Sequence, residues 1–130
     1  MPHHSVTTKY NISINVKVQY IEEQSSPPEN RYVFSYTINM LNKGTEPAQL
    51  ISRHWIITDA EGKTQEVKGP GVVGEHPYLK PGEDFTYTSG TIIHTPVGSM
   101  QGSYQMKAGD GQMFDAEIQP FTLTKPRFLH

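Results

Sequence analysis

Alternation of apolar and polar residues at every second position is the feature that most restricts how this chain can fold. In the stretch NISINVKVQY, every second residue from Ile12 to Tyr20 is apolar, and the residues between them are polar. Successive side chains of a β-strand point to opposite faces, so this pattern predicts a strand with one face on a core and the other in water.

The same period recurs along the chain, separated by turn signals. Strands are predicted in RYVFSYTINML, AQLISRHWIITD, FTYTSGTIIHT, GSYQMKAG and QMFDAEIQPFTL. The segments DAEGK, Pro81-Gly82 and Asp110-Gly111 carry turn chemistry, whereas the proline-rich EEQSSPPEN favours a surface loop. No segment has helical periodicity, so the sequence predicts an all-β sandwich rather than a βαβ fold.

The inward positions of these strands predict the core. Trp55, the only tryptophan, falls in the third predicted strand, where it is either the core tryptophan of an immunoglobulin-like sandwich or an ordinary large core side chain. The residues expected to be buried are Ile14, Val16, Phe34, Tyr36, Ile38, Trp55, Ile57, Phe85 and Ile118.

Size and composition restrict the class of protein. A chain of 130 residues suits one domain over residues 1–130 with one core. Cysteine is absent, which excludes a disulfide framework and favours a reducing, cytoplasmic setting. Neither a signal-like N-terminus nor an apolar run of membrane length is present, so we expect neither export nor insertion. A net charge of −2 with interspersed signs argues against nucleic acid and membranes as partners.

The stretch GPGVVGEHPY contains the spacing G-x-G-x-x-G at Gly69, Gly71 and Gly74. In dinucleotide-binding folds this motif follows a strand and opens a helix, but Pro77 and Pro81 leave no room for that helix here. The glycines are therefore expected to permit positive φ or close backbone approach. A small anion-binding nest in this loop stays open as an alternative.

No catalytic or metal-binding set emerges from the spacing of the residues. The motif G-x-S-x-G is absent, and the adjacent pairs Glu22-Glu23 and Glu83-Asp84 would point to opposite faces of an extended chain. We therefore expect no enzyme, no cofactor and no high-affinity metal site, and any weak metal site to include His76 rather than a terminal histidine. The histidines are His3, His4, His54, His76, His94 and His130.

The glycine stretch and the strand after it are the predicted binding surface. Val72-Val73 is an apolar pair in a loop and has to be either buried or used for binding. We expect the glycines to set the backbone shape, while Val72, Val73 and His76 present a contact surface. The candidate binding loop comprises Gly69, Gly71, Val72, Val73, Gly74 and His76, beside Tyr87, Thr88 and Ser89.

Nearly the whole chain resembles the ApaG family. The resemblance rests on G-V-V-G-E-x-P-x-L-x-P-G-E from Gly71 to Glu83, Y-T-S-G from Tyr87 to Gly90, and T-P-x-G-x-M-x-G-x-Y-x-M from Thr95 to Met106. It extends to the closing pair Leu129-His130. At His76 the family pattern has glutamine, which affects only the local polarity of the glycine loop.

The resemblance implies a fold and a setting. The fold is an immunoglobulin or fibronectin type III-like β-sandwich of about seven to eight strands in two antiparallel sheets. The family is bacterial and cytoplasmic, lacks a settled activity, is linked to cobalt resistance and magnesium efflux, and is named with a diadenosine tetraphosphate hydrolase as genomic neighbour. Related domains occur in eukaryotic F-box proteins and in a polymerase delta-interacting protein.

Two main hypotheses for the function follow from the resemblance. The first is a non-catalytic binding module with a protein partner of unknown identity, and it leaves a homodimer open. The alternative is a binder or sensor of a pyrophosphate-containing small molecule or of a divalent metal. An enzyme ranks third.

Overall fold

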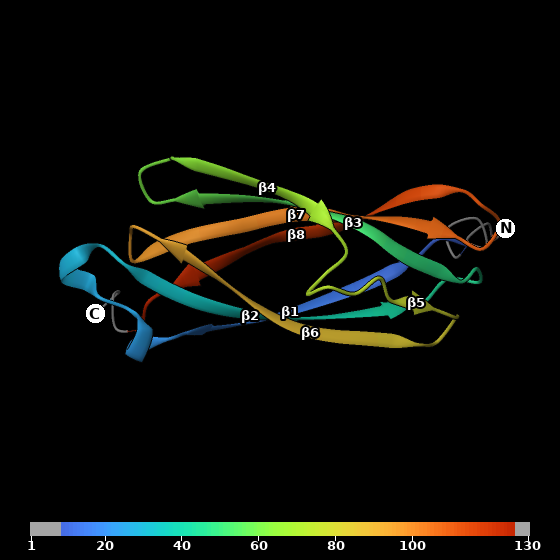
Figure 1. Ribbon diagram of the computed structural model, residues 1–130, viewed down its shortest axis with the longest axis horizontal. Helices are drawn as coiled ribbons and strands as arrows, with labels where there is room; N and C mark the ends of the chain where they lie inside the picture. The colour runs from blue at the N-terminus through green and yellow to red at the C-terminus, as the bar shows by residue number, and fades with distance from the viewer. Residues whose placement is uncertain (1–8, 127–130) are drawn as a thin grey trace, which may run out of the picture.

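The computed structural model describes residues 9–126, which form a sandwich of two antiparallel β-sheets (Figure 1). The strands are β1 (Ile12–Tyr20), β2 (Tyr32–Asn42), β3 (Ala48–Asp59), β4 (Thr64–Pro70), β5 (Tyr78–Leu79), β6 (Asp84–Ile93), β7 (Val97–Ala108) and β8 (Met113–Thr124). Two short 3₁₀ helices, η2 (Glu22–Gln24) and η3 (Pro27–Glu29), lie between β1 and β2. The described residues contain no α-helix.

The strand order confirms the predicted immunoglobulin or fibronectin type III-like sandwich. One sheet has the order β1-β2-β6, and the other has the order β4-β3-β7-β8 with β5 also paired to β3. Because β7 occupies one edge of β3, both β4 and β5 pair along its other edge. Along one side of the sandwich, β1 and β8 contact each other.

The turn predictions are confirmed where glycine occupies the left-handed region. Gly62 (φ +84°) lies in the β3–β4 hairpin, and Gly111 (φ +89°) lies in the β7–β8 hairpin. Gly82 (φ +89°) lies in the turn before β6, as the Pro81-Gly82 pair predicts. These conformations suit glycine because it has no Cβ to clash with the backbone.

The core between the sheets contains most of the predicted residues. Phe34, Tyr36, Ile38, Trp55, Ile57 and Ile118 are buried, as predicted. Three of the predicted core residues are only partly buried: Ile14, Val16 and Phe85. They lie on β1 and β6, the end strands of the smaller sheet, where no further strand covers them from one side.

No helix among residues 9–126 has the length and apolarity needed to cross a membrane.

Candidate functional site

The glycine loop, residues 71–77, connects β4 to β5 and carries a tight turn. Val72 and Glu75 exchange two backbone hydrogen bonds, of 2.9 and 2.8 Å. Between them Val73 has φ +42° and Gly74 has φ +81°. Positive φ at both central residues is the geometry of a type I′ turn, which favours Asn and Gly. A β-branched valine in this conformation is an outlier and stores backbone strain.

The loop is anchored to β3. The amide of Gly71 donates to the carbonyl of Ile51 (3.0 Å), and Nδ1 of His76 lies 3.2 Å from the carbonyl oxygen of Leu50. Ile51 is the residue at which the pairing of β3 with β7 shifts register, so a bulge turns its carbonyl toward the loop. These contacts give the loop a defined shape.

Gly71 is needed for that shape. Its φ is +60°, and a Cβ at this position would lie 2.4 Å from the carbonyl oxygen of Glu75. Gly71 therefore meets both expectations for these glycines, positive φ and close backbone approach. Gly69 is different, because its φ is not positive and its role is to make room for a side chain of β3.

The side chains of the predicted contact surface do not all face solvent. Val72 is 1% exposed and belongs to the core, whereas Val73 is 56% exposed. The prediction that Val72 presents a contact surface is wrong, because the turn sends adjacent side chains to opposite sides. Tyr87, which the candidate binding loop includes beside these residues, is buried as well and is not available for contact with a partner.

The other residues of the candidate binding loop also differ in how exposed their side chains are. Ser89 lies two residues after Tyr87, so its side chain points inward as well, and it is half-buried. Thr88 is exposed on the outer face of the sheet. The hydroxyl of Thr88 lies 2.8 Å from that of Thr37. The exposed members near the loop tip are Val73, Gly74 and His76.

The glycine loop lacks the context of a dinucleotide site. It is followed by β5 instead of a helix, as predicted. The amides of Gly71, Val72 and Glu75 already donate to carbonyls of the protein. An anion nest would have to use the remaining amides or break this turn.

Arg53 is a residue to which the sequence analysis assigned no role. It precedes the buried Trp55 by two positions on β3 and shares its inward direction. Its guanidinium lies over Gly69, where a Cβ would be 3.0 Å from both Nη atoms. Nη1 donates to the carbonyls of Pro70 (2.9 Å) and Gly71 (3.0 Å). In the sequence, Arg53 alternates with Trp55 and Ile57 at every second position, and this pattern could have indicated that the arginine points inward.

A groove lies between the two sheets beside Arg53. Its larger part has a volume of about 530 Å³ and is bounded by β2 and β6 on one side and by β3 and β4 on the other. A second cavity of about 240 Å³ shares Ile57, Gln65 and Ile92 with it, so the two form one continuous inter-sheet groove. The larger part is lined by Gln24, Val33, Tyr36, Arg53, Trp55, Ile57, Gln65, Val67, Ser89, Gly90, Thr91 and Ile92.

Two polar groups of this lining have donors left without a partner. Arg53 is the only charged residue of the larger part, and none of the ion pairs within residues 9–126 includes it. Nε1 of Trp55 is buried without a hydrogen-bond partner in the described part of the chain. Buried polar groups are nearly always paired, so the groove holds unused donor capacity.

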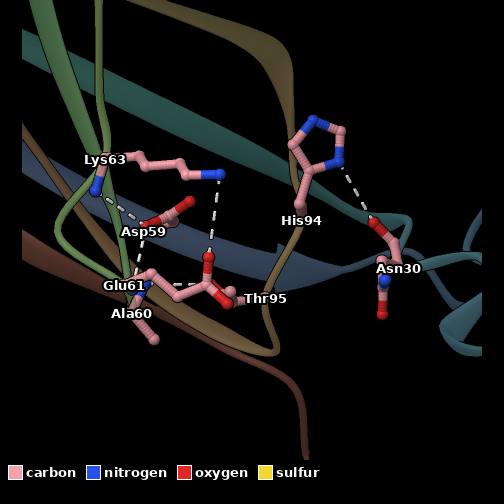
Figure 2. A network of polar contacts seen from close by, with 7 residues as sticks. All are labelled: Asn30, Asp59, Ala60, Glu61, Lys63, His94 and Thr95. Atoms are coloured by element: carbon pink, nitrogen blue, oxygen red, sulfur yellow. Dashed lines mark hydrogen bonds and ion pairs between the residues drawn. The ribbon is translucent and has the colours of Figure 1, made fainter.

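Hydrogen bonds to backbone amides shape the turns beside the smaller cavity (Figure 2). Oδ1 of Asp59 accepts hydrogen bonds from the amides of Glu61 (2.8 Å) and Lys63 (3.0 Å), which shapes the β3–β4 hairpin. The amide of Ala60 donates to Oγ1 of Thr95 (3.0 Å), which ties this hairpin to the connection between β6 and β7. Asp59 is therefore occupied by turn formation, and its carboxylate resembles a cap more than a catalytic group.

Buried phenols next to the groove stay neutral at ordinary pH. Burial raises the pKa of Tyr87 to about 12, and it raises the pKa values of Tyr36 and Tyr104 as well. The positive charge of Arg53 opposes these shifts only in part. None of these hydroxyls is set up as a base.

The histidines of the described residues are dispersed. Nε2 of His54 lies 2.5 Å from Oε2 of Glu66, His76 contacts β3, and Nδ1 of His94 lies 3.2 Å from the carbonyl oxygen of Asn30 (Figure 2). Residues 9–126 contain no group of three or more His, Cys, Asp or Glu side chains that could hold a metal ion. His3, His4, Leu129 and His130 lie outside the described residues.

Comparison with known proteins gives the family. Residues 22–108 match the ApaG domain, which spans β2 to β7 together with η2, η3 and the glycine loop. The chain belongs to the ApaG family. It is 63% identical to the Protein ApaG of Thiobacillus denitrificans, with 94% of this chain and 96% of that protein covered. It is 57% identical to the Protein ApaG of Methylobacillus flagellatus, with 94% and 96% covered.

A solved ApaG-type structure has the same fold. The crystal structure of a protein named ApaA from Bordetella pertussis superimposes with a TM-score of 0.90 at 48% identity. The alignment covers 92% of this chain and 98% of that chain. The resemblance stated from the motifs is thereby confirmed over nearly the full sandwich.

Proposed function

We propose that this ApaG-family protein is a non-catalytic binding module that recognises a protein partner through the tip of the glycine loop. The observation that carries the proposal is the exposed, strained Val73 (56% exposed, φ +42°). Strained residues persist where the surroundings hold them and are frequent at binding sites. A partner that covers this apolar side chain would remove it from water, which favours the complex.

A second exposed side chain extends the same surface. Tyr78 on β5 is 52% exposed, so two of the four large exposed hydrophobic residues among the described ones fall within residues 73–78. Tyrosine is enriched at the centres of protein interfaces. The proposal places this contact in the bacterial cytoplasm. The cobalt and magnesium phenotype of the family would then arise through the partner.

The test uses Val73→Asn. Asparagine tolerates the left-handed region, so this variant removes the apolar contact and relieves strain in the turn. We expect a melting temperature equal to or above that of the wild type, together with loss of the partner captured in a pull-down from the native cytosol. Met113→Asn is the matched control, because Met113 is 48% exposed on β8 and lies outside the loop.

Unchanged capture by Val73→Asn and by Tyr78→Ser would reject this surface. A captured second copy of the same chain would make the module a homodimer, and light scattering of the purified protein would report it.

The alternative function is a binder or sensor of a pyrophosphate-containing small molecule or a divalent metal. The observation that favours an anion is the guanidinium of Arg53, which lines the groove and has no acidic partner among residues 9–126. A thermal-shift screen with nucleotides, pyrophosphate and divalent metals separates the two functions, because a ligand that binds the native state raises the melting temperature by mass action. Under the leading proposal none of these compounds raises it.

A further inference from the structure

The free edge of β6 is less protected than the free edges of β1, β4 and β8. End strands expose unpaired backbone groups, and proteins usually protect them with charges, proline or bulges. β1 carries Lys17, β4 carries Glu66, Lys68 and Pro70, and β8 carries Asp115, Glu117 and Pro120. β6 carries one charged residue, Asp84, at its first position. From Phe85 to Ile93 it has no charged residue and no proline, and its register with β2 is unbroken. This edge is open to a further strand.

The inter-sheet groove runs beside that edge. Ser89, Gly90, Thr91 and Ile92 of β6 line it, and Ile92 is 41% exposed. In constant-type immunoglobulin domains a fourth strand pairs at the equivalent edge of the corresponding sheet. Here that sheet ends at β6, and the groove lies where the fourth strand would cover the core.

The charge of the groove restricts what could fill it. Arg53 is the only charged residue in its larger part and has no acidic partner among residues 9–126. Nη1 is used by the carbonyls of Pro70 and Gly71, and no hydrogen bond within the described residues uses Nη2. A carboxylate directed inward from an added strand would complement this charge.

We propose that the free edge of β6 binds an extended acidic segment of a partner protein as a fourth strand, with one carboxylate of the segment on Arg53. Main-chain hydrogen bonds to β6 provide affinity, and the carboxylate provides specificity, as in other cases of β-strand addition. This surface is separate from the tip of the glycine loop, so it goes beyond the proposed function.

The probes are fluorescein-labelled nonapeptides of alternating Val and Thr with a central Glu. A matched peptide has Gln at the centre, and a third carries N-methyl groups on every internal amide, so that neither of its edges retains a backbone donor. We expect the Glu peptide to bind about tenfold more tightly than the Gln peptide, because it gains a charge-assisted hydrogen bond. The N-methylated peptide should not bind, because it cannot pair with a strand edge.

Two readouts locate the bound peptide. Trp55 is the only tryptophan and lines the groove, so its fluorescence should change on binding. Amide hydrogen exchange of β6 should slow in the complex, because edge amides become hydrogen-bonded. Equal binding of the N-methylated peptide, unchanged exchange in β6, or no binding of the Glu peptide at millimolar concentration would overturn the proposal.

Ile92→Lys places a protecting charge on the free edge, and we expect it to weaken binding of the Glu peptide by at least about tenfold. The control Met113→Lys should bind like the wild type. Arg53→Gln should abolish the preference for Glu over Gln. If Arg53→Gln does not fold, the paired Glu and Gln peptides still test the carboxylate.

Sodium acetate and inorganic phosphate test for a site specific to small anions. Two results together would show that the site binds a free anion instead of a strand. Either salt would displace the Glu peptide, and the same concentration of salt would raise the melting temperature of the wild type but not that of Arg53→Gln. Val73→Asn should bind the Glu peptide normally. Failure of the loop-tip proposal and failure of this one are therefore distinguishable.

Discussion

The hydroxyl oxygens of Tyr87 and Tyr104 lie 2.5 Å apart inside the core and join the two sheets of the sandwich. Tyr87 belongs to β6 of the smaller sheet, and Tyr104 belongs to β7 of the larger one. Their rings are arranged edge to face, with centroids 6.5 Å apart. In a chain without cysteine, this hydrogen bond is a polar link between the two sheets, which immunoglobulin domains join by a disulfide between other strands.

A double-mutant cycle measures that link. Tyr87→Phe or Tyr104→Phe alone leaves the other hydroxyl buried without this partner, so each should lower the free energy of unfolding by about 1–3 kcal/mol. The double variant should cost less than the sum of the single variants, with a coupling energy of about 0.5–3 kcal/mol. Urea denaturation measures all four proteins, and strict additivity would show that the hydroxyls do not interact.

Stability should fall in alkaline solution. Phenols of the unfolded chain titrate near about pH 10, whereas burial raises the pKa of Tyr87 to about 12. Between these values the unfolded chain releases protons that the folded chain retains, so the stabilisation is complete below about pH 10 and declines as pH rises. Each such phenol contributes a slope of about 1.4 kcal/mol per pH unit. Denaturation between about pH 9 and about pH 11 should give a smaller slope for Tyr104→Phe than for the wild type.

Gly71→Ala should destabilise the fold more than Gly62→Ala. Both glycines have positive φ, so both substitutions incur left-handed strain of about 1–2 kcal/mol. Only at Gly71 would the new Cβ also meet a backbone atom, the carbonyl oxygen of Glu75 at 2.4 Å, whereas nothing lies within 4 Å at Gly62. Thermal melting should separate the two variants. Equal losses would mean that the loop relaxes around the new methyl group.

The loss of stability on replacing Trp55 should depend strongly on which residue takes its place. The residue is 2% exposed and contacts the rings of Tyr36, Tyr104 and Phe121, so Trp55→Ala should cost about 3–5 kcal/mol. Trp55→Phe keeps an aromatic ring and removes Nε1, which has no partner among the described residues. We therefore expect a much smaller loss for phenylalanine. An equal loss would show that Nε1 is paired in solution.

The sequence alone was sufficient for the fold class and for most of the strands, but it did not predict the two-residue β5. Every inward residue predicted on β2 and β3 is buried, and the bounds predicted for the third strand agree with β3. These features depend on the alternation of apolar and polar residues and on the conformational freedom of glycine in turns. Both can be identified from residues that are adjacent in the sequence. The family motifs lie in the same segments, so the resemblance could also be recognised without coordinates.

Only the tertiary structure decided which side chains are available for binding. Val72 and Val73 are adjacent and chemically identical, yet the type I′ turn buries one and exposes the other. The inward Arg53, the two-residue β5 and the inter-sheet groove depend on a bulge at Ile51 and on which strands end each sheet. A period of two specifies opposite faces of one strand, but the packing of strands distant in sequence determines what covers each face.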